Sequence, residues 1–338
     1  MSETLGRFGR QVSSRILLPG AVLAAAALLV AGTSLRAPAQ DAGGAAGQSN
    51  APANLVKVPA EVPADATRYS FLLAGNKAGL MAAWRTPDGA RHTYFSFNDR
   101  GRGPSILTRV VVDRAGFPTE VDASGNDYLK SPVEERFRMA GTPLRATWNS
   151  KSEHGEKQLS APAFYVPIDA ALDNEMEAAL LATPAGRLPL LPEGEVRIER
   201  VLDRTVEVNG KKQTVTLYEE SGLGFTPNPV WLTAEHESFA NGSDWSVLIR
   251  EGAESVWPAL LEAQKARASE RGAEVARRLA HKPGTPLLIR HARVFDSETA
   301  TVKDGMSVLI SGNRIEAVAP DGKLPTAAGA EVIDAKGK

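Results

Sequence analysis

The sequence contains no cysteine among its 338 residues. Disulfide bonds, a cysteine-linked lipid, thiolate catalysis and cysteine-ligated zinc are therefore excluded for this chain. An excess of charge of one sign is also missing, because 39 basic and 40 acidic residues leave a formal net charge of −1. Proteins that bind nucleic acid carry a basic patch or stripe, so this balance argues against a nucleic-acid partner.

Histidine pairs at metal-binding spacing are missing as well. The five histidines are His92, His154, His236, His281 and His291, and no two of them are two or four positions apart. Neither H-x-H nor H-E-x-x-H therefore occurs, and the G-x-S-x-G motif of serine hydrolases does not occur either. The sequence predicts no catalytic residue, no metal ligand and no cofactor in this chain, although a metal site assembled from distant residues stays open.

The N-terminal segment has the layout of a secretory signal peptide. Three arginines precede an apolar run at positions 16–31, and Ala37-Pro38-Ala39 provides an A-x-A cleavage site. We expect residues 1–39 to be removed after Ala39 by a Sec-type export route, which would place the protein in the periplasm or outside a bacterial cell. An uncleaved membrane anchor is the alternative, but a span needs about 20 apolar residues. No permanent membrane span is expected after cleavage.

The next segments differ in composition. Residues 40–66 are rich in Ala, Gly and Pro and are predicted to form a flexible linker. From residue 67 to 253, short apolar runs alternate with turn signals such as Asp88-Gly89 and Asn209-Gly210, which predicts an antiparallel β-rich domain. Residues 172–182 are a candidate cover for this sheet. The four turn formers within residues 186–194 predict a loop there.

Good helix formers dominate residues 254–285, for which we expect a helical linker. Gly272 is its weak point, so one long helix or two broken helices are expected. The segment 286–338 then reads as short strands, at Leu287–Phe295, Met306–Ile310, Arg314–Val318 and Glu331–Asp334. About fifty residues cannot bury a core of their own. The predicted class is mainly β with helices (α+β), without a complete (β/α)8 barrel.

Two polar segments are candidates for chemistry. The loop at positions 98–104 can bind an anion or another ligand through Asn98, Asp99, Arg100 and Arg102, or it can be a surface hairpin loop with paired arginines. Glu134 and Glu135 are adjacent, and neighbouring residues of a strand point to opposite faces. We therefore interpret them as part of a salt-bridged surface.

The C-terminal segment resembles the opening of the amidohydrolase superfamily of metal-dependent hydrolases. The resemblance covers residues 286–338 and rests on three features in the same order. These features are the strand with Ala292, Val294, Phe295 and Asp296, the hairpin "VLISGNRIEAV", and the final "EVIDAKGK". More loosely, residues 67–280 resemble a β-rich extension that precedes the hydrolase in some exported bacterial members.

The resemblance implies that residues 286–338 are the first half of a composite β-sandwich, whose family context is a (β/α)8 barrel holding zinc or another divalent metal. It implies an enzyme that hydrolyses carbon–nitrogen bonds of small amides or peptide-like substrates. The family's first metal ligands would come after "EVIDAKGK", so we expect a fragment that is inactive by itself. A periplasmic β-rich binding or interaction module without catalysis is the alternative, and unpaired strands could cause self-association.

Overall fold

The computed structural model describes residues 59–324 and 329–338 of the chain. It contains two compact units, Met1–Ala266 and Arg267–Lys338, hereafter unit 1 and unit 2. The described part of the chain is mainly β with few helices and has no closed barrel, which confirms the predicted β-rich class. The predicted signal peptide, with Ala37 and Ala39, lies outside the described residues.

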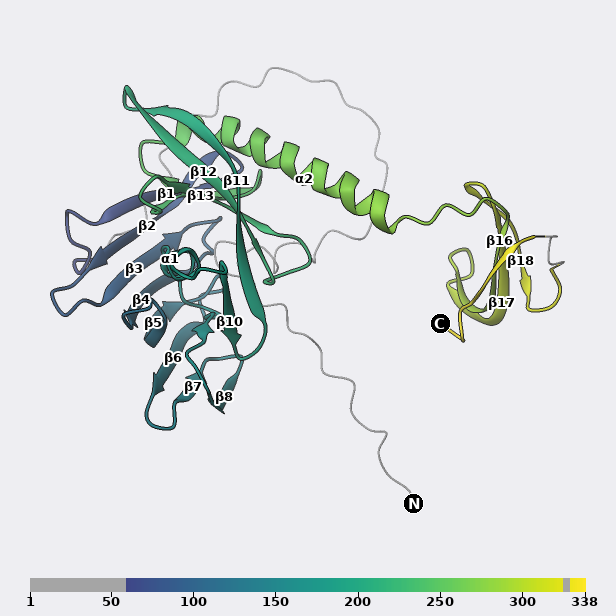
Figure 1. Ribbon diagram of the computed structural model, residues 1–338, viewed down its shortest axis with the longest axis horizontal. Helices are drawn as coiled ribbons and strands as arrows, with labels where there is room; N and C mark the ends of the chain where they lie inside the picture. Colours follow the sequence, from purple (N-terminus) through teal and green to yellow (C-terminus); the bar gives the residue numbers. More distant parts are fainter. Residues whose placement is uncertain (1–58, 325–328) are drawn as a thin grey trace. The chain divides into compact units, whose positions relative to one another are not determined.

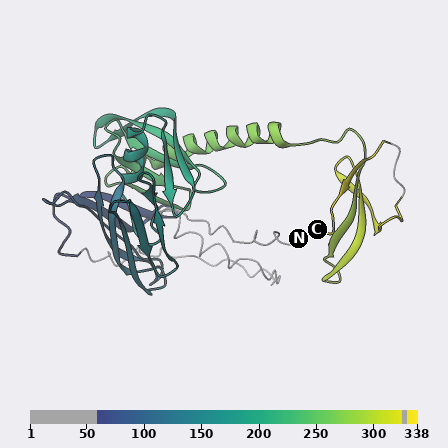
Figure 2. The ribbon, with the colours of Figure 1, turned by 60° about the horizontal axis from the view of Figure 1, so that its bottom comes forward.

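The sheet of unit 1 has two arms that meet at its centre. Its strand order is β8-β7-β6-β5-β4-β3-β2-β1-β15-β14-β13-β12-β11-β10-β9. In both ribbon views, the purple-to-blue strands of the first arm and the teal-to-green strands of the second form two distinct halves (Figures 1 and 2). The first arm consists of β1 (Thr67–Leu73), β2 (Asn76–Arg85), β3 (Arg91–Phe97), β4 (Ser105–Val112), β5 (Pro118–Asn126), β6 (Pro132–Ala140), β7 (Arg145–Asn149) and β8 (His154–Gln158).

The second arm returns along the chain toward the first strand. It consists of β9 (Phe164–Tyr165), β10 (Arg187–Leu191), β11 (Glu195–Val208), β12 (Lys211–Ser221), β13 (Asn228–Thr233), β14 (Ser238–Gly242) and β15 (Ser246–Arg250). Strand β15 pairs antiparallel with β1, from Tyr69↔Arg250 to Leu73↔Ser246. This pairing joins the two arms through the first and last strands of the unit.

The sheet curls so that its two ends come together. The rings of Phe137 in β6 and Tyr165 in β9 stack with centroids 4.4 Å apart, although these strands are far apart in the strand order. Helix α1 (Glu175–Ala182) buries Met176 and Leu180 against β10 and β11, between the two arms (Figure 1). The predicted cover at residues 172–182 is therefore a helix in the concavity of the sheet.

The strongest turn signals of the sequence are confirmed. Asn209 and Gly210 both have positive φ, 51° and 75°, as a two-residue type I′ hairpin requires, and they join β11 to β12. Residues 86–90 close the β2–β3 hairpin around Asp88-Gly89. The backbone N–H of Thr86 donates to the carbonyl of Ala90 at 3.0 Å. Short-range turn chemistry therefore located these hairpins correctly.

The prediction of a loop over residues 186–194 is wrong for residues 187–191, which form strand β10. Leu188 and Leu191 are 1% exposed, so burial of leucine outweighs the turn preference of the neighbouring prolines and glycines. Proline is tolerated because the pairing of β10 is short on both sides. Strand β10 pairs with β11 over three residues and with β9 over only two.

The segment after the sheet is one unbroken helix rather than two. A short 3₁₀ turn (Glu254–Val256) leads into α2 (Trp257–Leu279), which continues through Gly272. The first half of α2 buries Trp257, Leu260 and Ala263 in the core of unit 1, so it is part of that unit. Residues 59–66 of the predicted linker also pack on the sheet, where Val62 is 8% exposed.

Glu135 is buried, which corrects the interpretation of Glu134 and Glu135 as a salt-bridged surface. Its side chain is 0% exposed. Its carboxylate accepts hydrogen bonds from Tyr165 Oη (2.6 Å) and from the backbone N–H groups of Ile168 (2.9 Å) and Asp169 (2.7 Å). The carboxylate thus holds the 165–169 segment against β6, which no local pattern in the sequence indicates.

Unit 2 contains a four-stranded sheet in the order β18-β17-β16-β19. Its strands are β16 (Leu287–Asp296), β17 (Thr301–Ser311), β18 (Arg314–Pro320) and β19 (Glu331–Asp334), close to the predicted ranges. Strand β19 pairs parallel to β16 and the other pairs are antiparallel. The predicted strands and the β17–β18 hairpin are confirmed, whereas identity with an amidohydrolase sandwich stays a prediction.

Candidate functional site

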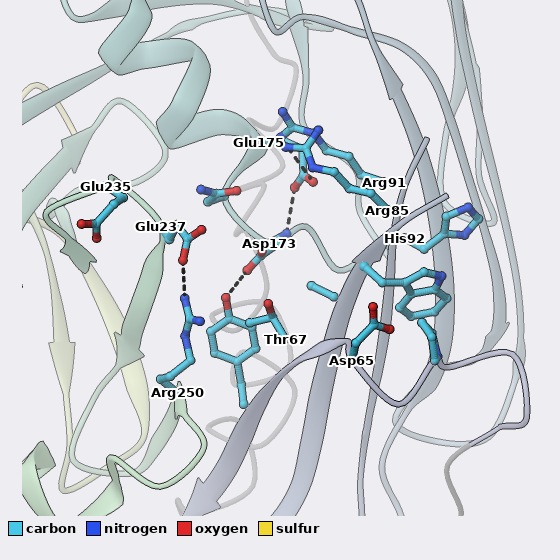
Figure 3. Close-up of a pocket in the computed structure, with 15 residues that line it drawn as sticks. Asp65, Thr67, Arg85, Arg91, His92, Asp173, Glu175, Glu235, Glu237 and Arg250 are labelled. Carbon is cyan, nitrogen blue, oxygen red and sulfur yellow. Dashed lines mark hydrogen bonds and ion pairs between the residues drawn. The ribbon is translucent and has the colours of Figure 1, made fainter. Parts of the chain in front are cut away.

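A charged cavity of about 540 Å3 lies at one end of the central strands of unit 1 (Figure 3). Strands β1, β2, β3 and β15 contribute their ends to it, and the segment before α1 and the β13–β14 turn complete its wall. Its charged lining residues are Asp65, Arg85, Arg91, Asp173, Glu175, Glu235, Glu237 and Arg250. We call it the main cavity.

Strand pairing places two arginines side by side at the main cavity. Arg85 and Arg91 form the last pair of the β2–β3 ladder, next to the Asp88-Gly89 turn, and paired residues share a face of the sheet. Figure 3 shows their guanidinium groups close together, directed toward Glu175. Arg91 Nη1 lies 3.7 Å from Glu175 Oε1, and Glu175 Oε2 accepts the N–H of Asp173 at 2.8 Å.

A second group of contacts is centred on Tyr69 and Asp173. The Tyr69 hydroxyl donates to Asp173 Oδ1 at 2.7 Å. Burial raises the pKa of Asp173 to about 7, and the nearby charge of Glu175 adds to this effect. Burial, followed by the charge of Asp173, raises the pKa of Tyr69 well above 10. The Tyr69 hydroxyl therefore stays protonated as a donor, while Asp173 can gain or lose a proton near neutral pH.

Arg250 closes this group from the opposite side. Its guanidinium lies over the Tyr69 ring, 5.3 Å from the centroid. Its Nη2 donates to Glu237 Oε2 at 3.1 Å and to the carbonyl of Ser238 at 3.0 Å. Arg250 is thus fixed by three partners. The Arg85–Arg91 end, by comparison, has two adjacent guanidinium groups facing the single carboxylate of Glu175.

The aromatic wall of the main cavity includes Trp84 and His92. Their rings stack with centroids 5.3 Å apart and an interplanar angle of 15°. Burial lowers the pKa of His92, and the nearby charge of Arg109 lowers it further. His92 is therefore a neutral ring at pH 7. It offers the cavity a flat surface rather than a third positive charge at this end.

The predicted ligand loop lies elsewhere, in the β3–β4 connection. Asp99 accepts hydrogen bonds from Tyr128 Oη (2.6 Å) and Arg100 Nε (3.0 Å), and these bonds lower its pKa, with that from Tyr128 having the larger effect. Arg102 Nη2 lies 3.8 Å from Asp99, and Asn98 Oδ1 accepts the N–H of Gly101 at 2.7 Å. None of the four residues lines the main cavity. Anion binding by this loop stays a prediction.

Histidines are scattered over both units. In unit 2, His291 lies 3.0 Å from Asp334 and 3.2 Å from Asp321, and Arg290 binds Asp321 through two nitrogens. Among residues 59–324 and 329–338, no group of three or more His, Asp or Glu side chains is arranged to hold a metal ion.

Comparisons with protein-family models, curated proteins and solved structures find no match to this chain. Within the described ranges, none of the helices combines the length and apolar character required to span a membrane.

Sequence reasoning missed the main cavity because its residues come from segments far apart in the chain. Asp173 and Tyr69, for example, are 104 positions apart. One partial signal was present, since Arg85 and Arg91 stand on either side of the predicted Asp88-Gly89 turn. A two-residue Asp88-Gly89 turn would pair Arg85 with His92, whereas the structure pairs Arg85 with Arg91, so the arginine pair was not predictable from the turn signal.

Proposed function

We propose that unit 1 is a binding module for a small charged organic molecule, which the main cavity holds. Its volume of about 540 Å3 lies within the range of about 300–1,000 Å3 that is common for ligand pockets. The observation that carries the proposal is the Arg85–Arg91 pair, because the two guanidinium groups lie side by side and, in the described part of the chain, only that of Arg91 is in an ion pair, with Glu175 at 3.7 Å. An anionic group of a ligand would pair with Arg85 and Arg91 through charge-assisted hydrogen bonds.

The test is a thermal-shift screen of the full chain with small carboxylates, phosphates and amino acids, followed by calorimetry of the compounds that stabilise it. We expect a carboxylate- or phosphate-bearing compound to bind. Arg85→Gln and Arg91→Gln should each weaken it by about tenfold or more, since a hydrogen bond to a charged group contributes about 1.5–3 kcal/mol. Arg136→Gln, at an exposed site on β6, is the matched control.

Two results would refute the binding module. One is that no compound in the panel binds at millimolar concentration. The other is that binding is the same in the wild type, both cavity variants and the Arg136→Gln control. The second result would place the ligand outside the main cavity.

A second proposal concerns unit 2, and it follows the resemblance to amidohydrolases. We propose that residues 286–338 form half of a composite β-sandwich in an enzyme that hydrolyses carbon–nitrogen bonds of small amides with a divalent metal. Cross-strand pairing supports it, because Ile289, Val308, Val318 and Ile333 lie on one face of the sheet. Val318 and Ile333 are 46% and 44% exposed, and an uncovered apolar sheet face favours a second layer.

Two measurements test this second proposal. The purified chain with added zinc should show no turnover of small amides or dipeptides, and metal-dependent turnover would refute the expectation that it is inactive by itself. Sequencing the DNA beyond the codon for Lys338 tests the family assignment. An in-frame His-x-His motif supports it, and an immediate stop codon in the native gene contradicts it.

Export of the chain is a further part of the proposal. The support is the sequence layout of residues 1–39, with basic residues, an apolar run and the Ala37-Pro38-Ala39 site. N-terminal sequencing of the protein from a bacterial periplasmic fraction should begin at Gln40. A cytoplasmic protein that retains Met1 would contradict this localisation.

A further inference from the structure

A second, smaller cavity of about 30 Å3 adjoins the main cavity, and Asp173 lines both. Five other polar residues line it: Glu177 of α1, Glu220 of β12, Asn228 of β13, and Ser238 and Asn241 of β14. A space of about 10–15 Å3 is enough for one water molecule. The small cavity therefore has room for one or two groups of that size.

Glu220 has an oxygen without a partner in this cavity. Its side chain is 1% exposed. Asn228 Nδ2 donates to Glu220 Oε2 at 3.0 Å, whereas the buried Oε1 accepts no hydrogen bond from any residue in the described part of the chain. A buried acceptor without a donor costs about 1–3 kcal/mol, and more when it is charged. A group that donates to Oε1 would remove this cost.

The charges around Glu220 are unbalanced. Burial raises the pKa of Glu220 to about 7, and burial together with the charge of Glu220 raises the pKa of Glu177 well above 4.5. Asp173 and Glu175 add further negative charge beside Glu177. Of the arginines that line the adjoining main cavity, Arg91 is paired with Glu175 and Arg250 with Glu237, and Arg85 does not line the small cavity. No ion pair within the described ranges joins a lysine or arginine to Glu177 or Glu220.

We propose that the small cavity receives a primary ammonium group of the ligand, with Glu220 Oε1 and the Glu177 carboxylate as its acceptors. An ammonium group is compact and carries three N–H donors, which suits a water-sized space lined by carboxylates. The rest of the organic ligand would lie in the main cavity beside Asp173. This inference rests on the proposed binding function, and it identifies the ligand as an amine, with an anionic group at the Arg85–Arg91 end.

The test uses n-butylamine as the probe and the full chain, with binding followed by NMR or calorimetry at pH 8 and pH 6. With a pKa of about 7, Glu220 is about nine-tenths ionised at pH 8 and about one-tenth ionised at pH 6. We therefore expect binding to be about tenfold weaker at pH 6. n-Butanol, which has the same chain length without the charge, should not bind, and calcium chloride should not replace the amine.

Glu220→Gln is the decisive variant, because glutamine keeps the shape and an acceptor for Asn228 but removes the charge. We expect it to weaken n-butylamine binding at least tenfold and to reduce the pH dependence, leaving the part that is due to Asp173 and Glu177. Glu199→Gln makes the same chemical change at an exposed position of the neighbouring strand β11 and should bind as the wild type does. If Glu220→Gln does not fold, Glu177→Gln provides the same comparison.

Three outcomes would overturn the ammonium site. They are equal binding of n-butanol, binding of calcium but not of the amine, and unchanged amine binding in Glu220→Gln and Glu177→Gln. If the arginine-dependent binding of an anionic compound is retained while the amine fails, the binding module stands and only the ammonium site is refuted. If the Arg85 and Arg91 variants also change nothing, the binding module itself fails.

Discussion

Replacement of Glu220 by glutamine should change how the stability of unit 1 depends on pH. In the folded protein, Glu220 holds its proton up to a pKa of about 7 because it is buried, whereas its ordinary value is 4.5. Between these two values the folded state binds more protons than the unfolded state. The free energy of unfolding therefore falls as the pH rises through this window. Glutamine does not titrate, so the variant lacks this contribution.

The size of the effect follows from the change in pKa. Each pKa unit corresponds to about 1.4 kcal/mol, so a rise from 4.5 to about 7 gives roughly 3 kcal/mol. This is a large part of the total stability of a typical domain, about 5–15 kcal/mol. The stability of Glu220→Gln relative to the wild type should increase by about this amount between pH 4.5 and pH 8. Asp173 titrates in both proteins, whereas the pKa of Glu177 depends on the charge of Glu220, so the comparison reports on the Glu177–Glu220 pair.

The assay is urea unfolding followed by tryptophan fluorescence at pH 4.5, 6, 7 and 8. Trp231 is fully buried in the core of unit 1 and reports on its unfolding. Glu199→Gln should show the pH dependence of the wild type. A difference between Glu220→Gln and the wild type that stays constant from pH 4.5 to 8 would refute the reasoning, as would a variant that becomes relatively less stable at pH 8.

Three further predictions concern other parts of the molecule. Glu135→Ala should lower the free energy of unfolding by about 3–5 kcal/mol in urea titrations, because it removes the acceptor of the Tyr165 hydroxyl and of two half-buried backbone N–H groups. A cost below about 1 kcal/mol would contradict this. Tyr69→Phe should raise the pKa of Asp173 above about 7 in a carboxyl-carbon NMR titration, since the hydroxyl stabilises the ionised form; an unchanged or lower pKa would argue against that contact. Val318→Asp should reduce binding of an apolar dye and any self-association seen by light scattering, without unfolding the sheet of unit 2, because this side chain is 46% exposed. Equal dye binding by Val318→Asp and the wild type would show that the dye does not bind the sheet face that carries Val318.

The hairpins and the strands of unit 2 were predictable because their signals are local. Asn209-Gly210 specifies a two-residue turn whatever surrounds it, since both residues accept positive φ. Strand β10 was not predictable in the same way. The prolines and glycines of residues 186–194 indicate a loop, but Leu188 and Leu191 meet a core that the rest of the sheet creates. Tertiary burial decided the conformation of that segment.

Single side chains also differ in how far the sequence predicts their environment. Alternation along β6 places Glu134 and Glu135 on opposite faces, and Val133, Phe137 and Met139 mark the face of Glu135 as the inner one. Glu135 is tolerated inside only because the 165–169 segment supplies donors to its carboxylate. Glu220 ends a run of buried residues in β12. Burial raises its pKa, whereas the hydrogen bond from Asn228 of the paired strand β13 lowers it.

The sequence by itself determined the antiparallel β class and the hairpin positions, because turn chemistry and side-chain alternation act over a few residues. The tertiary structure alone decided that Tyr69, Asp173, Arg250, Glu177 and Glu220 surround two adjoining cavities. The physical reason is that burial and charge pairing depend on which distant segments meet. That depends on β15 returning to pair with β1 and on α1 lying between the two arms of the sheet.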